Sequence, residues 1–178
     1  MSFPEIESKR ITLRELNEDD SASLFEVFSD ERAMKYWDSE IHKDIAVTIH
    51  GLRHMKSLWY SQQGVSWGIL LKQSQEIIGQ CSFHSWNIYN KESQLGYIIN
   101  PKYWGMGLGC EVLRLVVNFG FNELGLKTIL AEIDPDNIPS SIILEKNGFI
   151  LIETKKNDLK TNNVYHDTNI YKLSNVYA

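Results

Sequence analysis

Three glycines at alternate positions, Gly105, Gly107 and Gly109, separate a predicted strand from a predicted helix in the stretch "NPKYWGMGLGC". A strand, a glycine-rich loop and a helix start together form an anion site, because the bare backbone approaches a ligand closely and the first helical N–H groups lack intrahelical partners. Phosphate is the natural ligand of such a site. A turn without a ligand is the alternative, but a turn needs glycine at only one or two positions of positive φ. Glycine at all three positions therefore favours a backbone kept bare for a phosphate.

The loop fits neither of the two common nucleotide patterns. A Walker-type loop needs Gly-Lys-Ser/Thr, where this chain has Leu108, Gly109 and Cys110. The dinucleotide pattern G-x-G-x-x-G needs glycine where Cys110 or Val112 stands. The loop alone therefore does not identify the molecule that carries the phosphate.

Hydrophobic periodicity predicts about seven strands and about four helices along the chain. Strands are predicted at residues 10–16, 65–71, 76–84, 93–100, 127–133, 149–154 and 163–173. Helices are predicted after an N-cap at Asn17, over residues 42–64, from the glycines to near Gly125, and over residues 137–148. Both a hairpin and strand-helix-strand units occur, so we expect one α/β domain over residues 1–178 with a mixed, mostly antiparallel sheet.

Composition limits the classes of protein and partner. A net charge of −5 with 43% hydrophobic residues predicts a folded protein without broad nucleic-acid binding, and it is compatible with a cationic substrate. No stretch approaches the ~20 apolar residues that span a bilayer, so we expect no membrane association and a cytoplasmic location. Cys81 and Cys110 form neither a disulfide framework nor a cluster with zinc-ligand spacing, so no metal is expected.

Two long motifs resemble the GNAT superfamily of N-acetyltransferases, in the branch that acetylates N-termini of ribosomal proteins (RimJ/RimL-like). "LGYIINPKYWGMGLGCEVL" resembles the pyrophosphate-binding motif of that branch, in which an aromatic pair precedes G-x-G-x-G/A and a glutamate follows. "DPDNIPSSIILEKNGF" resembles its second signature, and "RITLRELNEDD" with "MKYW" resembles its opening. The resemblance implies a GNAT fold over nearly the whole chain.

The resemblance also implies acetyl-CoA as cosubstrate and assigns residues to it. Ile98 and Ile99 would pair their backbone with the pantetheine arm where the central strands splay apart. The pyrophosphate would be held by the loop, with Cys110 beginning the helix. The full implied set of cofactor-binding residues is Ile98, Ile99, Trp104, Gly105, Met106, Gly107, Leu108, Gly109, Cys110 and Asn137.

Ser140 and Asn137 are the catalytic residues that the resemblance implies. Ser140 would protonate the departing CoA thiolate, and Asn137 would position the cofactor or a water. The structural alternatives are a helix N-cap for Asn137 and a local backbone hydrogen bond for Ser140. The general base stays unassigned, because relatives carry a carboxylate in "EIGY" where this chain has Gln94. His84 and Glu92 are the nearby candidates.

We expect acetyl transfer to a primary amine in a ternary complex, and a protein N-terminal α-amine is the first choice of acceptor. A small amine (polyamine, amino acid or aminoglycoside) and a noncatalytic acyl-CoA-binding module are the alternatives. Tyr36 and Trp37 are interpreted as packing residues that could line the acceptor site, Cys110 as packing, and His166 and Asp167 as structural. The resemblance also implies a homodimer as one oligomeric state.

Overall fold

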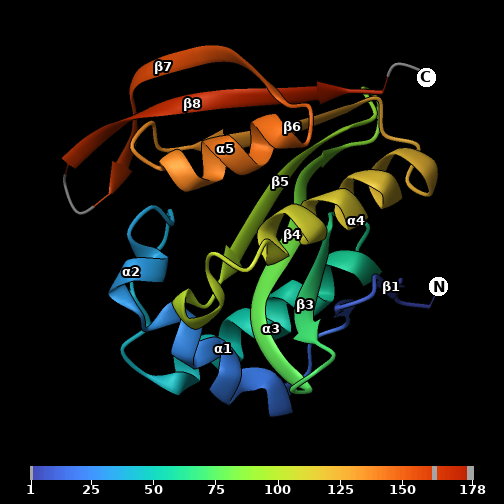
Figure 1. Ribbon diagram of the computed structural model, residues 1–178, viewed down its shortest axis with the longest axis vertical. Helices are drawn as coiled ribbons and strands as arrows, with labels where there is room; N and C mark the ends of the chain where they lie inside the picture. Colours follow the sequence, from blue (N-terminus) through green and yellow to red (C-terminus); the bar gives the residue numbers. More distant parts are fainter. Residues whose placement is uncertain (1, 162–163, 176–178) are drawn as a thin grey trace.

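A computed structural model describes residues 2–161 and 164–175, and in that part of the chain eight strands form one sheet (Figure 1). The strands are β1 (Ile6–Glu7), β2 (Ile11–Arg14), β3 (Val65–Leu71), β4 (Glu76–Asn87), β5 (Glu92–Ile99), β6 (Thr128–Ile133), β7 (Ile150–Thr161) and β8 (Val164–Ser174). Their order is β1-β2-β3-β4-β5-β6-β8-β7. The predicted mixed, mostly antiparallel sheet is confirmed, because β5–β6 is the one parallel pair among these strands.

The parallel pair separates soon after it begins. β5 and β6 are in register only from Glu92 with Thr128 to Gln94 with Leu130, whereas β5 continues to Ile99. On its other side β5 stays paired with β4 as far as Ile99. The second half of β5 therefore has an open edge in the middle of the sheet.

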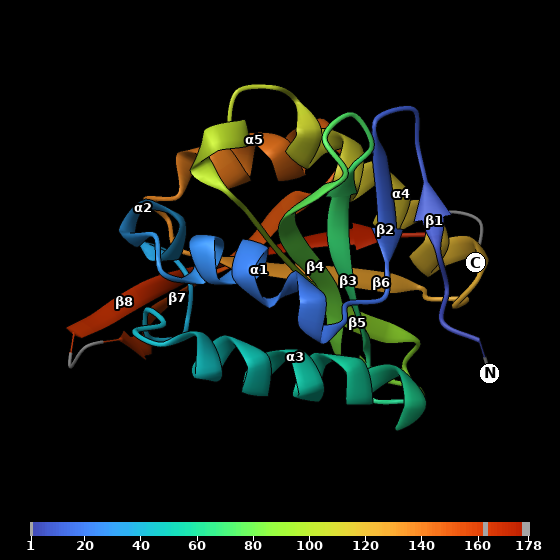
Figure 2. The same cartoon turned by 90° about the horizontal axis from the view of Figure 1, so that it is seen from below.

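Helices cover both faces of the sheet. The described helices are α1 (Ser21–Phe28), α2 (Glu31–Met34), α3 (Ile45–Tyr60), α4 (Leu108–Asn122) and α5 (Ile138–Lys146), with 3-10 turns at Glu18–Asp20 and Pro101–Tyr103. α1 and α3 lie on one face, and α4 and α5 lie on the other (Figure 2). No helix in the described part of the chain has both the length and the apolar character needed to cross a membrane.

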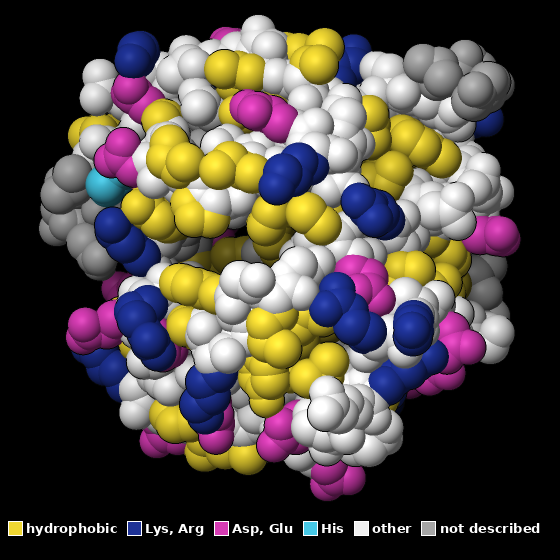
Figure 3. All heavy atoms as spheres, in the orientation of Figure 1, with side chains coloured by type: hydrophobic (Ala, Val, Ile, Leu, Met, Phe, Trp, Pro, Cys, Tyr) yellow, Lys and Arg dark blue, Asp and Glu magenta, His cyan; other side chains and the backbone are white. Residues whose placement is uncertain are grey.

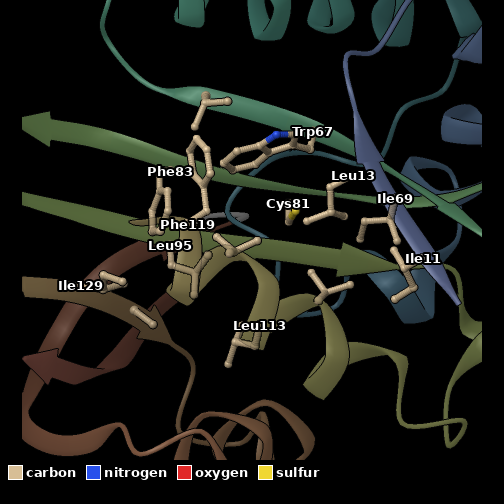
Figure 4. Packing of buried hydrophobic residues seen from close by; sticks show 14 of the residues in the cluster. Ile11, Leu13, Trp67, Ile69, Cys81, Phe83, Leu95, Leu113, Phe119 and Ile129 are labelled. Atoms are coloured by element: carbon tan, nitrogen blue, oxygen red, sulfur yellow. The ribbon is translucent and has the colours of Figure 1, made fainter. Parts of the chain in front are cut away.

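The larger core lies between the sheet and α4 (Figure 4). The ring of Trp67, fully buried on β3, meets Phe119 of α4 edge to face with 5.5 Å between ring centroids, and Phe83 of β4 at 6.2 Å. Gly120 lets α4 come this close, since a Cβ there would lie 2.8 Å from the Phe83 ring. This packing fixes the position of α4, and with it the glycine loop that precedes the helix.

The structure differs from the sequence prediction in short elements. β1 has two residues and α2 has four, and such lengths leave no periodicity to detect. Asn17 caps the 3-10 turn before α1 rather than α1 itself. α4 begins at Leu108, two residues before the predicted start at Cys110, because Gly107 already serves as its N-cap.

Candidate active site

The three glycines of the loop meet two different demands. Gly105 and Gly107 have φ of 76° and 73°, in the left-handed region that favours glycine. Gly109 lies in the first turn of α4, where a Cβ would be 3.0 Å from Ile143 of α5. Turn geometry therefore requires two of the glycines, contrary to the expectation of a backbone bare along its length, and close helix packing favours the third. A Cβ at Gly105 would still meet nothing within 4 Å among the described residues, so the loop surface is open.

The start of α4 suits an anion. Its N-cap Gly107 provides no side-chain hydrogen bond to the first turn, so the free N–H groups are left for a ligand or water. The loop is held from behind by Arg10, whose Nη1 donates to the Met106 carbonyl at 2.9 Å. Glu111, the glutamate of the first motif, accepts from Arg10 Nε at 2.6 Å. Arg10, just before β2, thus links the loop to the first turn of α4.

A cavity of about 680 Å³ opens in front of the loop. We call it the basic cavity, because the charged residues that line it in the described chain are Arg32, Lys35 and Lys146. Figure 3 shows the same face hollowed near its centre, with hydrophobic and basic side chains around the hollow. The open edge of β5 contributes Ile98 and Ile99 to the wall.

Nearly all the residues assigned to the cofactor or to catalysis from sequence line this one cavity. They are Ile98, Ile99, Trp104, Gly105, Gly107, Leu108, Gly109, Cys110, Asn137 and Ser140. Met106 lies outside the lining, because its carbonyl faces Arg10 and its side chain is exposed. Trp104 lines the cavity and donates a hydrogen bond from Nε1 to the Ile99 carbonyl at 2.8 Å.

Ser140 is joined to a tyrosine that the sequence reasoning missed. The Tyr97 hydroxyl donates to Ser140 Oγ at 3.3 Å, from β5 to α5. Burial raises the pKa of Tyr97 to about 12, so the phenol stays protonated at neutral pH. Asn137 caps α5 by accepting from the Ser140 N–H and also lines the cavity, so the structural reading and the cofactor reading of Asn137 are compatible. The one sequence feature that could have pointed to Tyr97 is its place within the first motif, in "LGYIIN".

A second cavity of about 620 Å³ adjoins the first. The two cavities share three lining residues, Lys35, Tyr36 and Trp37, so this segment lies at the boundary between them. Five carboxylates line the second cavity, which we call the acidic cavity: Asp38, Glu132, Asp134, Asp158 and Asp167. Two adjoining cavities of opposite charge therefore meet beside Trp37.

His84 lies in the acidic cavity opposite Gln94, its direct partner in the β4–β5 ladder. Burial lowers the pKa of His84, although the nearby charges of Asp38 and Glu132 raise it. The imidazole is therefore mainly neutral at pH 7 and can accept a proton. Glu92, the other candidate base, starts β5 and lies outside the lining of both cavities in the described chain.

The side chain of Gln94 holds the carboxylate of Glu132 close to it by a hydrogen bond. Its Nε2 donates to Glu132 Oε1 at 3.1 Å, and Glu132 comes from β6. Sequence reasoning missed Glu132, because only the pairing of β5 with β6 places the two together.

His166 and Asp167 have structural partners, as expected, and also line the acidic cavity. Asp167 pairs with Lys156 at 2.6 Å, and His166 Nδ1 lies 3.6 Å from Asp134 Oδ2. Of the five carboxylates, Asp167 is thus paired with a lysine and Asp134 lies beside an imidazole.

The sequence from residue 10 to residue 150 matches the acetyltransferase (GNAT) domain family. The chain belongs to this family. The uncharacterized N-acetyltransferase YoaA of Bacillus subtilis is 31% identical over 171 residues, which cover 96% of this chain and 97% of that protein. The ribosomal-protein-serine acetyltransferase of Escherichia coli is 26% identical over 110 residues, 62% of each chain.

The GNAT fold is also shared with solved structures. RimL, a ribosomal L7/L12 alpha-N-protein acetyltransferase in complex with coenzyme A, superposes with a TM-score of 0.85 at 20% identity, over 96% of this chain and 98% of that one. The chain described in this structure is accordingly a GNAT N-acetyltransferase with acetyl-CoA as cosubstrate. The family match, together with relatives named as N-acetyltransferases, supports an enzyme over the noncatalytic alternative.

Proposed function

We propose that the protein transfers acetyl directly from acetyl-CoA to a primary amine in a ternary complex, with the basic cavity holding the donor and the acidic cavity the acceptor. One observation carries this proposal: the two cavities have opposite charge and share Lys35, Tyr36 and Trp37. CoA phosphates suit the cations and helix start of one cavity, and an amine suits the carboxylates of the other. The two substrates would meet where the cavities meet.

The reaction forms a C–N bond, breaks the C–S bond of the thioester and moves two protons. The amine must be neutral when its nitrogen attacks, and it loses a proton as the amide forms. The thiolate of CoA gains a proton as it leaves. Ser140, which accepts a hydrogen bond from Tyr97, can donate its own hydroxyl proton to the thiolate and regain one from the phenol.

His84 is the residue we assign as base. It lies in the acidic cavity, and burial keeps its pKa below the usual histidine range, so its free form is available at neutral pH. Gln94 has no basic nitrogen and instead orients Glu132, whose charge favours the imidazolium that forms when His84 takes the proton. In this proposal the three residues take the place of the carboxylate that the resemblance to the family implies within "EIGY".

Likeness to ribosomal-protein acetyltransferases supports a protein N-terminal α-amine as acceptor, and the carboxylates of the acidic cavity support a small cationic amine. The first experiment separates binding from turnover. Acetyl-CoA is titrated into the protein by calorimetry, and release of the CoA thiol is then followed with a panel of amines and peptides. Saturable binding with acceptor-dependent thiol release is expected. Binding without release from any acceptor contradicts the proposed transfer.

A further inference from the structure

Three polar side chains form the closed end of the acidic cavity. Ser66 and Ser82 face each other across the β3–β4 ladder, and Gln80 lies two residues before Ser82 on the same face of β4. All three are buried, with exposed fractions of 1%, 9% and 3% respectively. Met55 and Leu58 of α3 complete this end of the cavity. The closed end of the acidic cavity is therefore polar where the sheet forms it and apolar where α3 forms it. We call the three polar side chains of the sheet the polar floor.

One atom of this floor has no partner. The Gln80 amide donates from Nε2 to Ser66 Oγ at 2.8 Å, but its Oε1 accepts no hydrogen bond from the described residues. Burying an acceptor without a donor is unfavourable, and native proteins seldom leave one in that state unless a ligand or a function requires it. The Gln80 carbonyl therefore offers a hydrogen-bond acceptor to a molecule that enters the cavity.

The charge of the cavity limits what that molecule is. Asp38, Glu132 and Asp158 have no cation within ion-pair distance in the described part of the chain. Carboxylates stabilise a protonated amine, whereas the attacking nitrogen must be neutral. Three unpaired carboxylates would therefore oppose the reaction of a molecule with a single amine. They favour a molecule that retains a positive charge on a second nitrogen while the first reacts.

We propose that the acceptor is a compact amine with a second cationic nitrogen, a linear diamine or polyamine, and that one of its N–H groups donates to Gln80 Oε1. This inference rests on the proposed function of the acidic cavity. The cavity volume of about 620 Å³ lies in the range of small-molecule sites. A protein N-terminus carries its backbone charge on the α-amine that reacts, and its next nitrogen is a neutral amide rather than a second cation.

The first test compares acceptors on the native protein. The value of kcat/KM is measured for 1,4-diaminobutane, for butylamine and for a short peptide with a free N-terminus. We expect the diamine to exceed butylamine by at least about tenfold. The double variant Asp38→Asn/Asp158→Asn should remove most of this preference. Glu123→Gln, an exposed carboxylate at the end of α4 outside both cavities, is the matched control and should leave the preference intact.

The second test uses Gln80→Met, which keeps the size of the side chain but removes both the unpaired carbonyl and the amide that donates to Ser66 Oγ. We expect KM for the diamine to rise about tenfold and the affinity for acetyl-CoA to stay the same, with a lower melting temperature because the hydrogen bond to Ser66 is lost. A merely structural glutamine would lower the melting temperature and leave KM for the diamine unchanged. If this variant does not fold, the comparison of acceptors on the native protein decides.

The outcomes of these tests separate the diamine inference from the proposed acetyl transfer on which it rests. Equal turnover of butylamine and the diamine, or preference for the peptide, overturns the diamine inference and leaves acetyl transfer intact. Absence of acetyl-CoA binding, or of thiol release with every acceptor, overturns the proposed function and the inference together.

Discussion

The side-chain amide of Gln94 donates a hydrogen bond to the carboxylate of Glu132, with 3.1 Å between Nε2 and Oε1. The two residues come from β5 and β6, the parallel pair that separates just beyond them. His84 is paired with Gln94 on the other side, in the β4–β5 ladder. The point where the sheet opens therefore has both a group that can accept a proton and a negative charge that stabilises the protonated form.

This arrangement predicts the pH dependence of acetyl transfer. Burial lowers the pKa of His84, so kcat/KM should rise with pH through an apparent pKa below the ordinary ~6.5. The charge of Glu132 raises the pKa of His84, and Glu132→Gln should therefore move the acid limb to still lower pH. The pH–rate profiles of the native protein and this variant measure the shift. A limb that moves to higher pH contradicts the assignment.

Replacing the base should slow the reaction without weakening donor binding. We expect His84→Gln to lower kcat about 10²-fold at neutral pH, the lower end of what general base catalysis contributes. The loss should shrink as pH rises, because more of the amine is then already neutral and hydroxide can take the proton that the nitrogen loses as the amide forms. Acetyl-CoA affinity, measured by calorimetry, should be unchanged, since His84 lines the acidic cavity and not the basic one. An equal loss at every pH indicates a structural role instead.

Removing Ser140, the proposed proton donor, should slow the departure of the CoA thiolate. We expect Ser140→Ala to lower kcat about 10²-fold with little change in acetyl-CoA affinity, and Tyr97→Phe to have a smaller effect in the same direction. Ser141→Ala is the matched control, because its hydroxyl donates to the Ile138 carbonyl within α5 and does not line the cavity. Steady-state rates of thiol release with saturating acetyl-CoA measure the effect. Similar losses from Ser140→Ala and Ser141→Ala contradict the assignment.

The glycine loop allows strain and ligand binding to be separated. Gly107→Ala places a side chain at φ of 73°, which costs about 1 kcal/mol of folding stability. The methyl group would face Arg10 Nη2 at 3.8 Å behind the loop, so the expected effect on the ligand comes from distortion of the N-cap of α4. Gly125→Ala imposes similar strain at φ of 64°, after α4 and away from both cavities. Both variants should lose similar stability in denaturant unfolding, but only Gly107→Ala should weaken acetyl-CoA binding, by about tenfold. Equal affinities would remove the loop from the donor site.

Most of the fold was predictable from local patterns. The alternation in "VSWGILL" and the apolar stripe of Val112, Val116 and Phe119 predict a strand and a helix, and both form. These elements are long enough for periodicity to show. α2 was missed because its four residues depend on capping by Asp30 rather than on any repeated pattern.

The donor site was also largely predictable, because one contiguous motif from Gly105 to Cys110 supplies the loop and the helix start. The acceptor site was not. Its polar floor combines Ser66 of β3 with Gln80 of β4, and its carboxylates come from four separate segments of the chain.

The sequence by itself therefore determined most of the secondary structure, the glycine loop at the start of α4 and the acetyl donor that the family uses, since each depends on residues close together along the chain. Only the tertiary structure decided which side chains lie together in the acidic cavity, where we propose the base and the acceptor. The separation of β5 from β6 opens the donor site, and their pairing joins Gln94 to Glu132. The carbonyl of Gln80 on β4 is buried in the acidic cavity without a hydrogen-bond partner among the described residues. Such contacts depend on which strands lie side by side, and local residue patterns do not determine that.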